Sequence, residues 1–131
     1  MDLQAKLKEW QKTKSVSTAN EICEHLSKRV ISDELFRQVV DWGRERNITN
    51  PDKQLCKVLE EVGEIAHEVC RSNYTSEELQ DALGDSMVAL IILADTLNFD
   101  ILFCLQGAYD TIKNRKGETI DGCFKKEEDI K

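Results

Sequence analysis

The spacing of apolar residues between positions 55 and 69 limits the fold of this chain more than any other feature. The apolar positions advance in steps of three and four, which places them along one face of an α-helix, whereas a strand would need strict alternation. A proline suits the first turn of a helix, so the pattern predicts a helix from about Pro51 to Ser72. The residues that form this face are Leu55, Val58, Leu59, Val62, Ile65, Ala66 and Val69.

Similar spacing predicts helices along most of the 131-residue chain. Before residue 50 it predicts a helix carrying Leu3, Leu7 and Trp10, a second helix over 18–28, and a third from an N-cap at Ser32 to about residue 46. After residue 72 it predicts a helix that starts with a capping box at Thr75, and a last helix over 101–114. We expect no strand of any weight, and residues 118–131 are expected to form a loosely held polar tail.

These elements predict an all-α fold, in which four main helices form a bundle behind an N-terminal helical extension. The boundaries that we expect are 1–30 for the extension, 31–118 for the helical domain and 119–131 for the polar tail. The segment from Met87 to Ala94 is apolar almost all round, so its helix must be central or covered by a second subunit. One proline and six glycines argue against a turn-rich β fold.

Charge and composition exclude several classes of function. The chain has 18 Lys and Arg against 25 Asp and Glu, a net charge of −7, which argues against a nucleic-acid partner because phosphate backbones require a basic surface. The longest apolar run, from Met87 to Ala94, is far too short to cross a membrane, and the first residues do not resemble a secretion signal. Five widely spaced cysteines without a CxxC pair indicate reduced, mostly buried thiols in a cytoplasmic protein.

Two runs of carboxylates interrupt consecutive apolar helices. Glu60, Glu61, Glu64 and Glu68 form one acidic stripe, in which Lys57 is the base at a partner position. Glu78, Asp81 and Asp85 form a second stripe, which ends directly before the most apolar stretch. An unpaired acid that faces a core is costly unless it binds a cation, and clusters of oxygen ligands suit Mg²⁺ or Mn²⁺. The alternative is that each run is a solvated helix face.

These two motifs resemble those of the MazG-type, all-α nucleoside triphosphate pyrophosphohydrolases. The similar segments are Glu60-Glu61-Val62-Gly63-Glu64-Ile65-Ala66 and Asp81-Ala82-Leu83-Gly84-Asp85, within a similarity that covers about residues 31–118. The chain looks most like the short MazG-like proteins of bacteriophages and prophages. The resemblance implies a helical bundle completed by a second subunit, as a homodimer or a dimer of dimers. It also implies Mg²⁺-dependent cleavage between the α and β phosphates, giving a nucleoside monophosphate and pyrophosphate.

By position, the resemblance implies that Glu61 and Glu64 are catalytic and that they bind metal together with Asp85. The chain departs from the family at Ala82, where the second motif has a glutamate, and the nearest acid is Asp81. Three alternatives remain open. Asp81 is the fourth ligand, or Glu68 or Glu78 takes that place, or the site is impaired.

Supporting roles are assigned by residue type and position. Lys57 is expected either to bind a substrate phosphate or to pair with Glu61. Asn114, Arg115 and Lys116 either reach the phosphates or complement the dipole of the last helix. Trp42 and Phe99 are candidates for stacking on a base, with core packing as the alternative.

Two other classes of function compete with this hypothesis. Glu64 and His67 form a Glu-x-x-His pair, which di-iron carboxylate bundles use in duplicate, and a dimer would supply the second copy. A non-enzymatic helical interaction module also fits the apolar helix after Met87. The base and sugar preference of a nucleotide substrate is not encoded in any motif.

Overall fold

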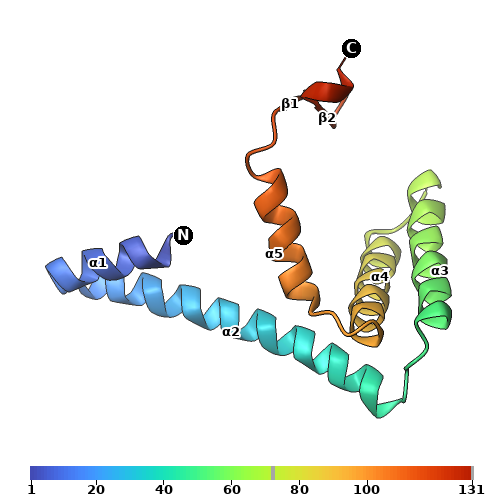
Figure 1. The fold of residues 1–131 in the computed structure, drawn as a ribbon, viewed down its shortest axis with the longest axis horizontal. Coiled ribbons are helices and arrows are strands. Elements are labelled where there is room, and N and C mark those ends of the chain that lie inside the picture. Colours follow the sequence, from blue (N-terminus) through green and yellow to red (C-terminus); the bar gives the residue numbers. More distant parts are fainter. Residues whose placement is uncertain (72, 131) are drawn as a thin grey trace. The chain divides into compact units, whose positions relative to one another are not determined.

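A computed structural model describes residues 1–71 and 73–130, without the side chains of residues 27–32 (Figure 1). The described residues are mostly helical, as the sequence predicts, with a small two-stranded sheet at the C-terminal end. The chain divides into two compact units, Met1–Thr49 and Asn50–Lys131. The elements are α1 (Leu3–Thr13), α2 (Val16–Glu45), α3 (Pro51–Cys70), α4 (Ser76–Thr96), α5 (Ile101–Ile112), β1 (Gly117–Ile120), β2 (Cys123–Lys126) and the 3₁₀ helix η1 (Glu127–Asp129).

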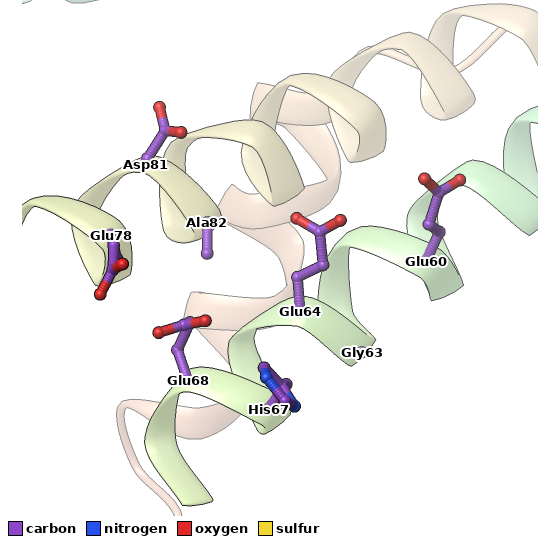
Figure 2. A pocket seen from close by; sticks show the side chains of 8 residues that line it. All are labelled: Glu60, Gly63, Glu64, His67, Glu68, Glu78, Asp81 and Ala82. Atoms are coloured by element: carbon purple, nitrogen blue, oxygen red, sulfur yellow. The ribbon is translucent and has the colours of Figure 1, made fainter. Parts of the chain in front are cut away.

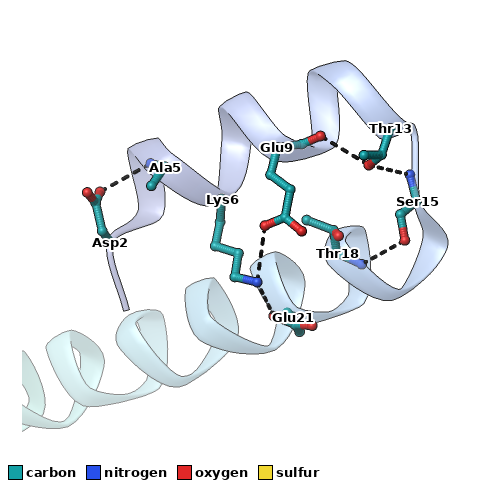
Figure 3. A network of polar contacts seen from close by, with 8 residues as sticks. All are labelled: Asp2, Ala5, Lys6, Glu9, Thr13, Ser15, Thr18 and Glu21. Carbon is teal, nitrogen blue, oxygen red and sulfur yellow. Dashed lines mark hydrogen bonds and ion pairs between the residues drawn. The ribbon is translucent and has the colours of Figure 1, made fainter.

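The first unit consists of α1 and α2. The carboxylate of Asp2 accepts hydrogen bonds from the first backbone amides of α1, which begins the helix. Lys6 joins the two helices, because its Nζ lies 3.2 Å from Glu9 and 2.9 Å from Glu21 of α2 (Figure 3). The hydrogen bond with Glu21, followed by that with Glu9, raises the pKa of Lys6. This unit is therefore held together by polar contacts as well as by the buried Ile22.

α2 runs without a break from Val16 to Glu45, so the predicted division into two helices near residue 30 is wrong. The segment contains no proline and no glycine before Gly43, and therefore nothing in its backbone forces the helix to stop. The predicted N-cap role of Ser32 lies outside the described side chains. The helix crosses the boundary that we expected between the extension and the helical domain.

The second unit is built on an antiparallel pair of helices, α3 and α4 (Figure 1). Asn50 caps α3 through the backbone amide of Lys53, and Thr75 and Glu78 form the predicted capping box at the start of α4. On each helix a set of shielded positions advances in steps of three and four. The set consists of Gln54, Val58, Glu61, Ile65 and Glu68 on α3, and of Leu79, Ala82, Ser86, Ala89, Leu93 and Thr96 on α4. Near the end of α4, Ile91, Ile92 and Ala94 are buried as well.

The shielded face of α3 is thus more polar than the sequence pattern predicts. Leu55, Leu59 and Val62 remain exposed within this single chain, and Leu59 keeps 63% of its surface. The apolar stretch of α4 is divided in the same way, because Ile91 and Ile92 are buried whereas Met87 is 57% exposed. The α3–α4 pair therefore presents a row of apolar side chains to its surroundings.

α5 begins at Asp100, whose carboxylate accepts hydrogen bonds from the amides of Leu102 and Phe103. None of its residues is buried, and Phe103 and Leu105 keep 79% and 61% of their surfaces exposed. Among the described residues, no single helix is long and apolar enough to cross a membrane. α4 and α5 meet that condition only when taken together, and their axes bend by 104° at the junction.

The C-terminal segment is a β-hairpin rather than the expected loose tail. Strands β1 and β2 pair antiparallel through a turn at Asp121 and Gly122, both of which have positive φ, 50° and 75°. An Asp-Gly pair is a strong local hairpin signal, because both central residues of a type I′ turn need positive φ. The sequence analysis missed this signal. All five cysteines are free, and they are exposed rather than buried.

Candidate functional site

An open pocket of about 490 Å³ lies between α3 and α4, and most of its wall is acidic (Figure 2). Figure 2 shows carboxylates from both helices around it, with those of α3 on one side and those of α4 on the other. Acids of the two runs therefore line one pocket. The sequence alone predicts two acidic stripes, without showing that they lie side by side. The lining residues are Glu60, Gly63, Glu64, His67, Glu68, Glu78, Asp81 and Ala82.

The pocket contains two of the four predicted metal ligands. Glu64 projects from α3 and Asp81 from α4, and both are exposed to solvent. Neither forms an ion pair with another described residue. The other two expected ligands, Glu61 and Asp85, are not among the described residues that line the pocket, although the resemblance implies both as ligands.

Glu61 belongs instead to the shielded face of α3. Its side chain is 7% exposed, and its Oε1 lies 2.6 Å from Nζ of Lys57, one turn earlier on the helix. Lys57 also lies 3.1 Å from Glu60. The hydrogen bonds to Glu61 and then to Glu60 raise the pKa of Lys57 above its ordinary value. Of the two roles expected for Lys57, the structure contains the pairing with Glu61.

Glu68 is the most shielded carboxylate of the pocket wall, with 14% of its side chain exposed. Its Oε1 lies 3.2 Å from Nη1 of Arg71, a pairing that the sequence analysis overlooked although the i,i+3 spacing allows it. Its Oε2 is buried and has no hydrogen-bond partner among the described residues. An acceptor of this kind is costly to keep unsatisfied, so it favours a donor or a cation at this point of the pocket.

Glu78 has a structural role in addition to its place in the wall. Its Oε2 accepts a hydrogen bond from the backbone amide of Thr75 at 3.0 Å, while its own amide donates to the Thr75 hydroxyl. The backbone hydrogen bond, and after it the hydroxyl, lowers the pKa of Glu78. One carboxylate oxygen remains available to the pocket.

Ala82 occupies the centre of the pocket on the α4 side. It is 5% exposed, and its methyl group is directed towards α3, across from Glu64 and Glu68 (Figure 2). Asp81, the acid displaced by one position, stands beside it at the exposed edge. The departure from the family motif therefore lies inside the acidic pocket.

The donor set suits a hard cation such as Mg²⁺, because it consists of carboxylate oxygens together with one histidine. The unpartnered Oε2 of Glu68 agrees with this. The side chains do not converge as they stand: no three described His, Cys, Asp or Glu residues lie close enough together to hold a metal ion. The chemical types of these ligands therefore suit a cation. To bind it, the side chains that line the pocket would have to turn towards one another.

The basic and aromatic candidates lie elsewhere. Arg115 and Lys116 line a separate pocket of about 500 Å³ after α5, together with Lys126, Glu127 and Glu128, and Asn114 is exposed. Trp42 belongs to the first unit, where the guanidinium of Arg46 lies 4.0 Å from the centre of its ring. Phe99 is 62% exposed in the turn before α5. None of these candidates is among the described residues that line the acidic pocket.

Gln54 is a residue of this region that the sequence analysis did not single out. Its side-chain amide is buried and donates a hydrogen bond to the carbonyl oxygen of Ala89 on α4, at 3.0 Å. A signal was present, since Gln54, Glu61 and Glu68 are spaced by seven residues and so share one face of α3.

Comparison with known proteins gives one relative of undetermined function. The chain is similar to an uncharacterized 18.2 kDa protein from the rep-hol intergenic region of Haemophilus phage HP1, with 30% identity over 70 residues. The match covers 51% of this chain and 42% of the relative, so the chain spans less than half of that protein. No family model and no solved structure matches the chain.

Proposed function

We propose that the second unit is a Mg²⁺-dependent nucleoside triphosphate pyrophosphohydrolase whose site is the acidic pocket between α3 and α4. The observation that carries this proposal is the meeting of carboxylates from two consecutive helices in one pocket, around the unpartnered Oε2 of Glu68. The resemblance of the two motifs to MazG-type enzymes supplies the reaction. The proposed products are a nucleoside monophosphate and pyrophosphate.

In this proposal Glu64 and Asp81 are the principal ligands of Mg²⁺ or Mn²⁺, and Glu68 and Glu78 supply further oxygens. The chemistry that a cation held by these residues would supply is charge neutralisation on the triphosphate and a more acidic attacking water. Glu64 would orient the attacking water and accept its proton, because its carboxylate is exposed at the pocket and has no competing ion pair. Asp81 thus replaces the glutamate that is absent at position 82.

Asp85 and Glu61 enter the proposal through the resemblance alone. Asp85 is exposed on α4 one turn beyond Asp81. Glu61 does not line the pocket, because its side chain is shielded and paired with Lys57.

We also propose that two copies of the chain associate through the apolar side chains that remain exposed on α3, α4 and α5. Leu59, Met87 and Phe103 are each more than half exposed within one chain, which is unusual for large apolar residues. A symmetric pair would cover them and complete a four-helix arrangement. Light scattering at micromolar concentration is expected to give a dimer or a dimer of dimers. Phe103→Glu should dissociate it, whereas Gln106→Glu, also on α5, should not. A monomeric parent would contradict this proposal.

The function is tested with a panel of canonical, damaged and uracil-containing nucleoside triphosphates, with Mg²⁺ or Mn²⁺, by following phosphate products. Pyrophosphate together with a monophosphate is the expected result. Release of orthophosphate with a diphosphate would contradict the proposed cleavage position. The activity must also depend on added metal, and excess chelator must abolish it.

A second candidate function, a non-enzymatic helical interaction module, is favoured by one observation. Glu61 pairs with Lys57 on α3 and Glu68 pairs with Arg71, the residue that follows α3, so the charge of each of these two acids is balanced by a nearby base. If no nucleotide yields pyrophosphate and Mg²⁺ leaves the melting temperature unchanged, this second function replaces the first.

A further inference from the structure

We propose that Lys57 is a built-in counter-ion for Glu61, and that this ion pair within α3 allows Glu61 to be shielded beside α4 without metal. Glu61 is then a positioning residue of the acidic pocket rather than one of its metal ligands. This inference rests on the proposed function only where it concerns Mg²⁺, because the ion pair itself is a property of the metal-free chain.

The burial of the two partners is unequal. Glu61 keeps 7% of its side-chain surface, whereas Lys57 keeps 48%. A carboxylate that is shielded to this degree needs a charged or hydrogen-bonding partner, since desolvation disfavours its ionised form. The Lys57 ammonium supplies that charge at 2.6 Å, while its other side remains in solvent. The pair can therefore form without the full cost of burying two ions.

The position of Glu61 in the helix pair explains why it is shielded. It lies seven residues after Gln54, and two turns of helix return it to the same face of α3. Because Gln54 bonds to Ala89 and the helices run antiparallel, two turns forward on α3 correspond to two turns back on α4. Glu61 therefore stands level with Ala82 to within about one turn.

Small residues on α4 make room for this arrangement. Ala82 is buried, and Ser86 is half-buried with its hydroxyl donating to the carbonyl oxygen of Ala82 at 2.9 Å. A second carboxylate at position 82 would face acids on α3 and would demand a cation between the helices. The chain has a methyl group there instead, and the charge of Glu61 is balanced within α3.

In this proposal the acids of the site have two different roles, positioning of α3 and binding of the cation. Glu61 fixes the rotation of α3, and Glu64, three residues later, is thereby held at the pocket. Of the acids that line the pocket, Glu64, Glu78 and Asp81 form no ion pair with a described residue, and Glu78 already accepts a hydrogen bond from the Thr75 amide. A cation therefore gains most by binding Glu64 and Asp81. Mg²⁺ should then stabilise the protein without disturbing the contact between Lys57 and Glu61.

A double-mutant cycle in chelator tests the pair. Lys57→Met should lower the melting temperature of the full chain by about 5 °C, because it leaves Glu61 shielded and unpaired. In the Glu61→Gln background the same change should cost about 1 °C. Lys53→Met, at an exposed lysine one turn earlier, is the matched control and should also cost about 1 °C. Equal losses at Lys57 and Lys53, or additive losses in the cycle, would overturn the proposal.

The role of Glu61 is tested by the rise in melting temperature that Mg²⁺ produces. That rise should be preserved in Lys57→Met and Glu61→Gln, and lost in Glu64→Gln. If Mg²⁺ no longer raises the melting temperature of Glu61→Gln, Glu61 is a metal ligand. If Mg²⁺ raises the melting temperature of Lys57→Met more than that of the parent, Lys57 competes with the metal. Either outcome overturns the proposal. If Lys57→Met does not fold, Lys57→Arg should fold and melt as the parent does. If the parent shows no Mg²⁺ effect, the proposed function fails while the cycle in chelator still decides the ion pair.

Discussion

The side-chain amide of Gln54 donates a hydrogen bond to the backbone carbonyl oxygen of Ala89, 3.0 Å away, across 35 residues of sequence. Among the described residues, this contact ties a side chain of α3 directly to the backbone of α4. It fixes the level of one helix against the other, and hence which acids of the two motifs face each other across the pocket.

Replacing Gln54 should therefore weaken the helix pair. Gln54→Ala removes a buried hydrogen bond and leaves space, and should lower the free energy of unfolding by about 1–3 kcal/mol. Gln54→Met keeps the length and removes only the hydrogen bond, and should cost about 1 kcal/mol. Urea denaturation followed by circular dichroism measures both. Equal stability of Gln54→Ala and the parent would mean that the contact contributes nothing.

The exposed acids of the pocket should matter for activity and hardly at all for folding. Glu64→Gln and Asp81→Asn should each lower pyrophosphate release by at least about 100-fold, because each removes charge that would hold the cation. Asp85→Asn shows whether the site continues one turn along α4, and the resemblance predicts a similar loss. Glu77→Gln is the control, since Glu77 is exposed on the first turn of α4 and does not line the pocket. Full activity in Asp81→Asn would move the fourth ligand to Glu68 or Glu78.

Introducing an acid at position 82, as in the MazG-type motif that the sequence resembles, should harm this chain. Ala82→Glu introduces a carboxylate at a site that is 5% exposed, opposite other acids, and should destabilise the metal-free protein by about 2–4 kcal/mol. Mg²⁺ should recover part of this loss without raising activity above that of the parent. Ala82→Gln separates the effect of size from that of charge. Higher activity in Ala82→Glu would show that the parent site lacks a ligand.

The capping box of α4 should make stability depend on acid. The Thr75 amide lowers the pKa of Glu78 below its ordinary value of 4.5, so the carboxylate stabilises the fold above the unfolded-state pKa. That contribution is lost as the pH falls through the lowered folded-state pKa. The urea midpoints of the parent and of Glu78→Gln should therefore differ at neutral pH and converge in acid. A constant difference down to about pH 3 would contradict this linkage.

Helix ends were largely predictable because capping is local chemistry. The capping box at Thr75 and the start of α3 at Pro51 follow from side chains within one turn of the helix end. The same local logic failed for the break expected near residue 30, because the chain has no glycine or proline there to stop α2. The Asp121–Gly122 turn was equally local, and its hairpin was missed because the flanking strands are short and polar.

The sequence by itself determined that the chain is mostly helical and that two acidic runs interrupt consecutive helices. Helical periodicity and charge are properties of neighbouring residues, so they can be read along the chain. Tertiary structure alone decided which acids share a pocket. Glu61 and Glu64 are three residues apart, yet one is shielded beside Lys57 and the other is exposed and lines the pocket. The physical reason is that the rotation of α3 is set by contacts such as Gln54 with Ala89, which join residues distant in sequence.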